Sequence, residues 1–119
     1  TWSSFEKEFT KLWNTERTGM LYPKTMFENQ SHSSGKALQD LLNDIWRNSL
    51  GFCGIEMHRR CLSLAHNADF ERIEDAKRRA PLEARNLMMG RELILNSGKI
   101  KNTASLLKLA HKFNRENFL

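Results

Sequence analysis

The sequence has 119 residues, the size of one small domain, and its 39% hydrophobic and 28% charged residues predict a folded chain rather than a disordered one. A mean hydropathy of −0.61 and the lack of an apolar run of about 20 residues exclude a membrane-spanning helix, and no secretion signal is visible. The net charge of +5 permits a nucleic acid, a phosphorylated ligand or an acidic protein as partner and selects none of them.

A first helix is predicted at the N-terminus, with Ser3 and Glu6 as a capping box and an end near Gly19. Its apolar residues recur at helical spacing and are Trp2, Phe5, Phe9, Leu12 and Trp13. Residues 18–35 mix Gly, Pro, Ser and Asn with few apolar residues, so we expect a long loop there. The apolar residues expected to anchor this loop are Leu21, Tyr22, Met26 and Phe27.

The second helix is predicted by an apolar face made of Leu38, Leu41, Leu42, Ile45 and Trp46. The apolar face of residues 55–65 lies nearly opposite on a helical wheel. Gly51 and Gly54 stand between the two faces, so we expect either a bend there or one long helix that is buried on different sides at its two ends. We expect a third helix from about Gly54 to His66, followed by a connector over residues 67–74.

Asp75 is the expected N-cap of a fourth helix. Pro81 is expected to interrupt it early, either as a kink or as the first residue of a restarted helix, and the apolar stripe that crosses Pro81 favours the kink. That stripe consists of Ala76, Ala80, Ala84, Leu87, Met88, Ile94 and Leu95. Thr103 is expected to cap a last amphipathic helix with Leu106, Leu107, Ala110, Phe113 and Phe118 on its apolar face. The elements together predict an all-α fold that forms a single subdomain over residues 1–119.

The chain has two cysteines, Cys53 and Cys61, too few for a disulfide framework. On a helix they would be separated by about 12 Å of rise, too far to bridge, so reduced thiols and a cytoplasmic setting are expected. His58 and Cys61 have a spacing that suits a shared metal ion, but Cys53 and His66 diverge from them. We therefore expect no metal site, and instead one or two small buried thiols and ordinary histidines.

One polar arc of the third helix, about 120° wide, carries Glu56, Arg59, Arg60, Ser63 and His66. It has two interpretations. Glu56 can pair with both arginines on a solvated face. Alternatively, Arg59 and Arg60 form a cationic site for a phosphate or a hydroxyl-bearing ligand. Spacing alone favours the solvated face.

The stretch from Ile45 to Glu83 resembles the C-terminal region of methylthioribose kinase. The matching elements are an aromatic-bearing helix followed by Leu50-Gly51-Phe52, Gly54, Arg59-Arg60, Leu64-Ala65-His66, Asp69-Phe70-Glu71 and Ile73-Glu74-Asp75. The opening TWSSFEKEFTKLW is similar to the helix that follows the catalytic core of that family. Similarity is strong over about residues 50–95 and weak over residues 1–49, and the tail from Lys99 contributes little.

The resemblance implies a C-terminal helical subdomain of a protein-kinase-like enzyme of the aminoglycoside and choline kinase type. Such an enzyme phosphorylates the 1-hydroxyl of 5-methylthioribose with ATP and Mg²⁺ in methionine salvage. The nucleotide-binding lobe, catalytic aspartate and metal-binding acidic motif of the family have no counterpart here. ATP and Mg²⁺ would therefore be held outside this chain, and the chain alone would be inactive. The first residue, Thr1, is not a methionine, which also predicts a processed chain or a fragment.

The family's paired arginines, which assist substrate binding and phosphoryl transfer, fall on Arg59 and Arg60, so these are the expected catalytic and substrate-binding residues. His58 stands where the family usually has an aliphatic residue and Ser63 where it usually has glycine. These departures indicate a divergent branch or altered packing. The partners implied are 5-methylthioribose and the remainder of the kinase; we also expect a homo-oligomer, with no membrane attachment.

The alternative is a free-standing basic helical module that binds nucleic acid or a protein partner. A turn at Gly51–Gly54 between two short helices permits a helix-turn-helix. Against this interpretation, the supposed recognition helix would expose Glu56 beside its arginines, and no basic N-terminal arm precedes it.

Overall fold

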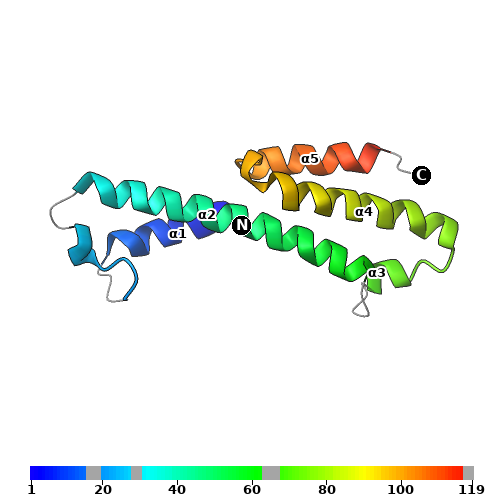
Figure 1. The fold of residues 1–119 in the computed structure, drawn as a ribbon, viewed down its shortest axis with the longest axis horizontal. Coiled ribbons are helices and arrows are strands. Elements are labelled where there is room, and N and C mark those ends of the chain that lie inside the picture. Colours follow the sequence, from blue (N-terminus) through cyan, green and yellow to red (C-terminus); the bar gives the residue numbers. More distant parts are fainter. Residues whose placement is uncertain (16–19, 28–30, 63–67, 117–119) are drawn as a thin grey trace. The chain divides into compact units, whose positions relative to one another are not determined.

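The computed structural model describes residues 1–15, 20–27, 31–62 and 68–116. Helices and turns make up this part of the chain, and it contains no strand, which confirms the predicted all-α class (Figure 1). The α-helices are α1 (Trp2–Asn14), α2 (Ser31–Leu62), α3 (Ala68–Glu71), α4 (Ala76–Asn96) and α5 (Thr103–Arg115). Two short 3₁₀ helices join them, η1 (Lys24–Phe27) and η2 (Ser97–Lys99).

The chain groups into two compact units, Thr1–Trp46 and Arg47–Leu119. Helix α2 contributes its first part to unit 1 and its second part to unit 2. It runs unbroken through Gly51 and Gly54. The prediction of a separate third helix that starts near Gly54 is therefore wrong, and the helix-turn-helix alternative lacks its turn. The predicted end of that helix at His66 lies outside the described residues.

In unit 1, Thr1 caps α1, because its side-chain oxygen accepts a hydrogen bond from the Ser4 amide at 3.3 Å. The predicted capping box of Ser3 and Glu6 is wrong, since Ser3 already lies inside the helix. The helix ends at Asn14 rather than near Gly19. The cap is thus a hydroxyl-bearing residue, as predicted, but it is Thr1 and lies two positions before Ser3.

Trp13 is the centre of unit 1, where it is buried and its indole Nε1 donates to Ser34 Oγ at 3.1 Å. The rings of Tyr22 and Phe27 lie 5.7 and 6.1 Å from it, so these two predicted anchors hold the connecting segment. The other two predicted anchors, Leu21 and Met26, are exposed. Helix α2 begins at Ser31, inside the range 18–35 predicted as loop.

In unit 2, Asp75 caps α4 as predicted, accepting from the Lys77 amide at 2.9 Å, and the helix continues through Pro81. A short helix, α3, lies in the predicted connector. Helix α5 is capped by Asn102, whose Oδ1 accepts from the Ser105 amide at 2.8 Å; the predicted cap Thr103 is its first helical residue.

Helices α2 and α4 approach each other so closely that glycine is required on both. A Cβ atom on Gly54 would lie 2.5 Å from the Gly90 carbonyl oxygen, and one on Gly90 would lie 2.8 Å from His58 Nδ1. Helices α4 and α5 lie side by side (Figure 1). The buried apolar side chains of this unit are Leu50, Leu93, Ile100 and Phe113. The predicted stripe of α4 omitted Leu93, which is 1% exposed, and included Leu95, which is exposed.

Candidate functional site

The arginine pair lies in the last turn of α2, where Glu56 contacts both guanidiniums. Glu56 Oε1 accepts from Arg59 Nε at 2.9 Å, and its Oε2 accepts from Arg59 Nη2 at 2.7 Å. Arg60 Nε lies 3.6 Å from the same Oε2. The side chains of Arg59 and Arg60 are 44% and 52% exposed, so a ligand can reach them.

The geometry follows from helical spacing, because residues three and four positions after Glu56 lie on the same side of the helix. The hydrogen bonds from Arg59 are the largest cause that lowers the pKa of Glu56 below its ordinary value of 4.5. The same bonds raise the pKa of Arg59 above its ordinary value. Both shifts favour the charged forms of Glu56 and Arg59 at neutral pH.

The rest of the predicted polar arc, Ser63 and His66, lies outside the described residues. The same face of α2 carries two exposed apolar side chains that the sequence did not mark as part of a site, Phe52 and Ile55, which are 69% and 50% exposed. They precede Arg59 by seven and four positions, a spacing that places all three on one side of the helix. The sequence showed that these three residues share one side of the helix, through their i, i+3 and i+7 spacing. It did not show that Phe52 and Ile55 are exposed, because exposure depends on whether another element covers that side.

The imidazole of His58 and the thiol of Cys61 form hydrogen bonds within unit 2. His58 Nδ1 donates to the Gly54 carbonyl at 2.9 Å, and Cys61 Sγ accepts from Asn86 Nδ2 at 3.0 Å. Cys61 is half-buried, whereas Cys53 is exposed, so the predicted buried thiols do not include Cys53. In the part of the chain that the structure describes, no three His, Cys, Asp or Glu side chains gather to hold a metal ion.

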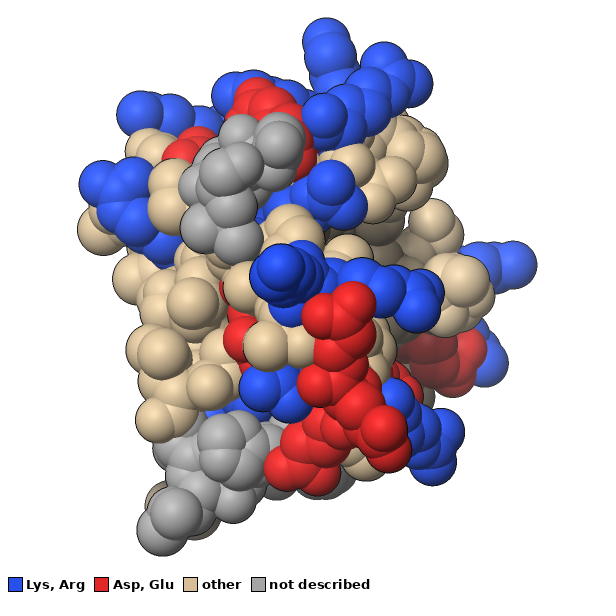
Figure 2. All heavy atoms as spheres, turned by 90° about the vertical axis from the view of Figure 1, so that its right-hand side faces the viewer, with Lys and Arg blue, Asp and Glu red and all other residues tan. Residues whose placement is uncertain are grey.

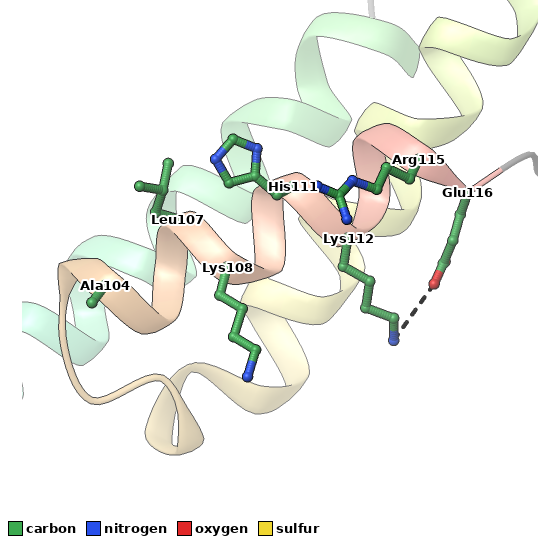
Figure 3. Close-up of a pocket in the computed structure, with 7 residues that line it drawn as sticks. All are labelled: Ala104, Leu107, Lys108, His111, Lys112, Arg115 and Glu116. Atoms are coloured by element: carbon green, nitrogen blue, oxygen red, sulfur yellow. Dashed lines mark ion pairs between the residues drawn. The ribbon is translucent and has the colours of Figure 1, made fainter.

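A surface hollow on α5 is lined by Ala104, Leu107, Lys108, His111, Lys112, Arg115 and Glu116 (Figure 3). Lys108 and Lys112 extend to one side of the helix, and Leu107 and His111 extend to the other (Figure 3). Lys112 pairs with Glu116 at 3.7 Å. Because its lining comes only from α5 and the C-cap residue Glu116, the hollow is open, and no second element faces these polar groups across it.

Charges of both signs occur on the face shown in Figure 2, where basic side chains are interspersed with acidic and uncharged ones. The described residues on this face therefore form no continuous basic surface of the kind that tracks a nucleic-acid backbone. Among the described helices, none combines the length and apolar character that crossing a membrane requires.

Comparisons with known proteins bear on this site. A methylthioribose kinase from Escherichia coli is 33% identical over 110 residues, which are 92% of this chain and 26% of the relative. Methylthioribose kinase 1 of Oryza sativa subsp. japonica is 30% identical over 118 residues, 98% of this chain and 27% of the relative. A methylthioribose kinase from a Geobacillus species is 32% identical over 109 residues, 92% of this chain and 25% of the relative. No family model and no solved structure matches the chain.

The match to the rice protein covers 98% of the chain, so it extends into residues 1–49, where weak similarity was expected, and into the tail from Lys99, which was expected to contribute little. The chain spans about a quarter of the length of these relatives, between 25% and 27%. The resemblance predicted from the sequence is therefore confirmed: over nearly its whole length, the chain is similar to one segment of the methylthioribose kinases of bacteria and a plant.

Proposed function

We propose that this chain is the helical segment of a methylthioribose kinase that supplies Arg59 and Arg60 to the active site. The enzyme would transfer the γ-phosphate of ATP to the 1-hydroxyl of 5-methylthioribose, a step of methionine salvage. The observation that carries the proposal is the similarity over 92% and 98% of the chain to proteins named methylthioribose kinase.

Phosphoryl transfer depends mainly on positioning and on positive charge that offsets the negative charge of the phosphoryl oxygens. Arg59 and Arg60 present two guanidiniums side by side, each partly exposed, at the end of a long helix. Guanidiniums are planar forked donors and remain charged at any physiological pH. This arrangement suits an anionic ligand, and it also suits an ordinary ion-paired surface. Kinetic measurements on arginine variants distinguish these two interpretations.

ATP and Mg²⁺ are assigned in this proposal to the part of the kinase that this chain does not include. The support is that the chain spans only 26% of the Escherichia coli relative. We therefore expect the isolated chain to bind neither ATP nor the sugar productively. Its two unpaired thiols, Cys53 and Cys61, fit a reducing compartment such as the cytoplasm.

A segment exchange tests the proposal. This chain would replace the matching segment of the Escherichia coli methylthioribose kinase, and ATP-dependent phosphorylation of methylthioribose would be assayed. We expect activity well above that of the same kinase with the segment deleted. A chimera that melts cooperatively yet phosphorylates no methylthioribose would contradict the proposal. Retention of nucleic acid by the isolated chain at physiological salt would instead support the basic-module alternative.

A further inference from the structure

A single carboxylate, that of Glu56, serves both guanidiniums of the pair. Consecutive residues on a helix diverge by about 100°, so Arg59 and Arg60 leave the helix in different directions. Glu56 lies between those directions, one turn earlier. Its contacts of 2.9 and 2.7 Å with Arg59 and of 3.6 Å with Arg60 draw the two cations together.

The pair of Arg79 and Glu83 on α4 provides a comparison within the same unit. Its closest contact joins Arg79 Nε to Glu83 Oε1 at 3.4 Å. The two side chains are 37% and 35% exposed, so they are somewhat less exposed than those of Arg59 and Glu56, at 44% and 48%. Burial therefore does not explain the closer contact at Glu56. A two-point contact fixes the plane of a guanidinium as well as its position, which a single contact does not.

We infer that Glu56 is a positioning residue, which holds Arg59 and Arg60 on one side of α2 so that an approaching phosphoryl group meets both guanidiniums. This inference rests on the proposed function of the arginine pair. Glu56 also reduces the local charge from two cations to one net positive charge. Its contribution is therefore orientation rather than attraction, because removing it increases the attraction of the site for an anion.

Loss of orientation and gain of attraction for an anion affect kcat and KM differently. In the chimeric kinase, Glu56→Gln should lower kcat by at least about threefold, since the guanidiniums lose their fixed orientation. The KM for ATP should stay the same or fall, since a negative charge has been removed. A variant that merely weakened the fold would not separate kcat from KM in this way. The matched control, Glu83→Gln in the pair with Arg79, should change neither.

A double-mutant cycle then shows whether Glu56 acts through the arginines. In an Arg59→Ala background, Glu56→Gln should change kcat by less than about twofold, because the two-point contact with Arg59 is gone and only the looser 3.6 Å contact with Arg60 remains. Normal kcat in Glu56→Gln together with a large loss in Arg59→Ala would overturn the positioning role and leave the proposed function intact. Normal kcat in both arginine-to-alanine variants would overturn the proposed function itself.

A second measurement on the 119-residue chain keeps the inference testable should the chimera be inactive. Nitrogen-15 NMR resolves the Nε–H groups of arginine side chains, and their exchange with water reports hydrogen bonding. We expect slower exchange for Arg59 than for Arg79, and loss of that protection in Glu56→Gln but not in Glu83→Gln. Equal exchange of Arg59 in the parent chain and in Glu56→Gln would overturn the inference.

Discussion

The guanidiniums of Arg59 and Arg60 combine exposure with a defined geometry, and this combination leads to the first prediction. In the chimeric kinase, Arg59→Ala or Arg60→Ala should lower turnover more than tenfold, a loss above about 1.4 kcal/mol in the barrier. Lysine should rescue poorly, because an ammonium cannot reproduce a planar forked donor. Steady-state kinetics with methylthioribose measures both effects.

The control for this prediction is Arg79→Ala, which removes an arginine of similar exposure from an ion pair elsewhere in the same unit. It should leave turnover unchanged. Melting temperatures should differ little among the three variants, since exposed ion pairs are worth only about 0–1 kcal/mol. Normal turnover in both Arg59→Ala and Arg60→Ala, with a small loss of melting temperature, would favour the solvated-face interpretation.

The lowered pKa of Glu56 leads to the second prediction, which concerns pH. A carboxyl with a lower pKa in the folded state adds stability above its unfolded-state pKa, and that stability is lost as the pH falls through the folded-state value. The melting temperature of the parent chain should therefore exceed that of Glu56→Gln by a small margin near neutral pH. The margin should vanish well below pH 4.5, the ordinary value for this carboxyl. Melting curves across that range check it, and a margin that grows in acid would contradict it.

The Glu56 contacts could be predicted from the sequence, because spacings of three and four residues on a helix place side chains together whatever the surroundings. The exposure of Phe52 and Ile55 could not, because it depends on whether another element covers that face. The same distinction applies to the thiols. The sequence predicted one or two buried thiols from residue type, without saying which; Cys61 is partly covered and contacts Asn86 of another helix, whereas Cys53 is exposed.

At the scale of elements, the crossing of α2 and α4 leads to the third prediction. Gly54→Ala places a Cβ 2.5 Å from the Gly90 carbonyl oxygen, so the helices must separate, at a cost of about 1–3 kcal/mol. Gly51→Ala is the matched control on the same helix, where a Cβ meets nothing within 4 Å. It should stabilise the chain by about 0.5–1 kcal/mol, because alanine is the better helix former. Urea unfolding of both variants should give shifts of opposite sign, and shifts of the same sign would contradict the crossing.

The helices themselves were mostly predictable, and the errors have local causes. Asp75 was identified as a cap, but the caps of α1 and α5 are Thr1 and Asn102, one or two positions before the residues expected. Several neighbouring side chains can accept the same backbone hydrogen bond, so sequence alone does not choose among them. The unbroken course of α2 was one of two arrangements left open. From sequence, glycines within a helix suggest a bend or an end of the helix. Only the structure shows that Gly54 instead allows the close approach of α4.

At the scale of the whole molecule, several large apolar side chains of unit 2 remain exposed, among them Phe52, Leu62 and Leu95. Phe52 and Ile55 also line a shallow groove whose other walls come from Arg47, Asn48, Gly51 and Ser97. The chain spans about a quarter of its relatives, so a full-length kinase has further surface to cover such side chains. An isolated chain has none, and exposed apolar patches favour self-association.

The fourth prediction is that the isolated chain associates through this groove. Sedimentation should show a mass that rises with concentration, and Phe52→Ser should weaken the association because it removes the largest apolar side chain of the groove. Leu95→Ser is the control, since Leu95 is similarly exposed but does not line the groove. It should leave the association nearly unchanged. Neither variant should melt at a much lower temperature, because both replaced side chains already face water. A chain that stays monomeric at high concentration, or an equal effect of both variants, would show that the groove does not direct the association.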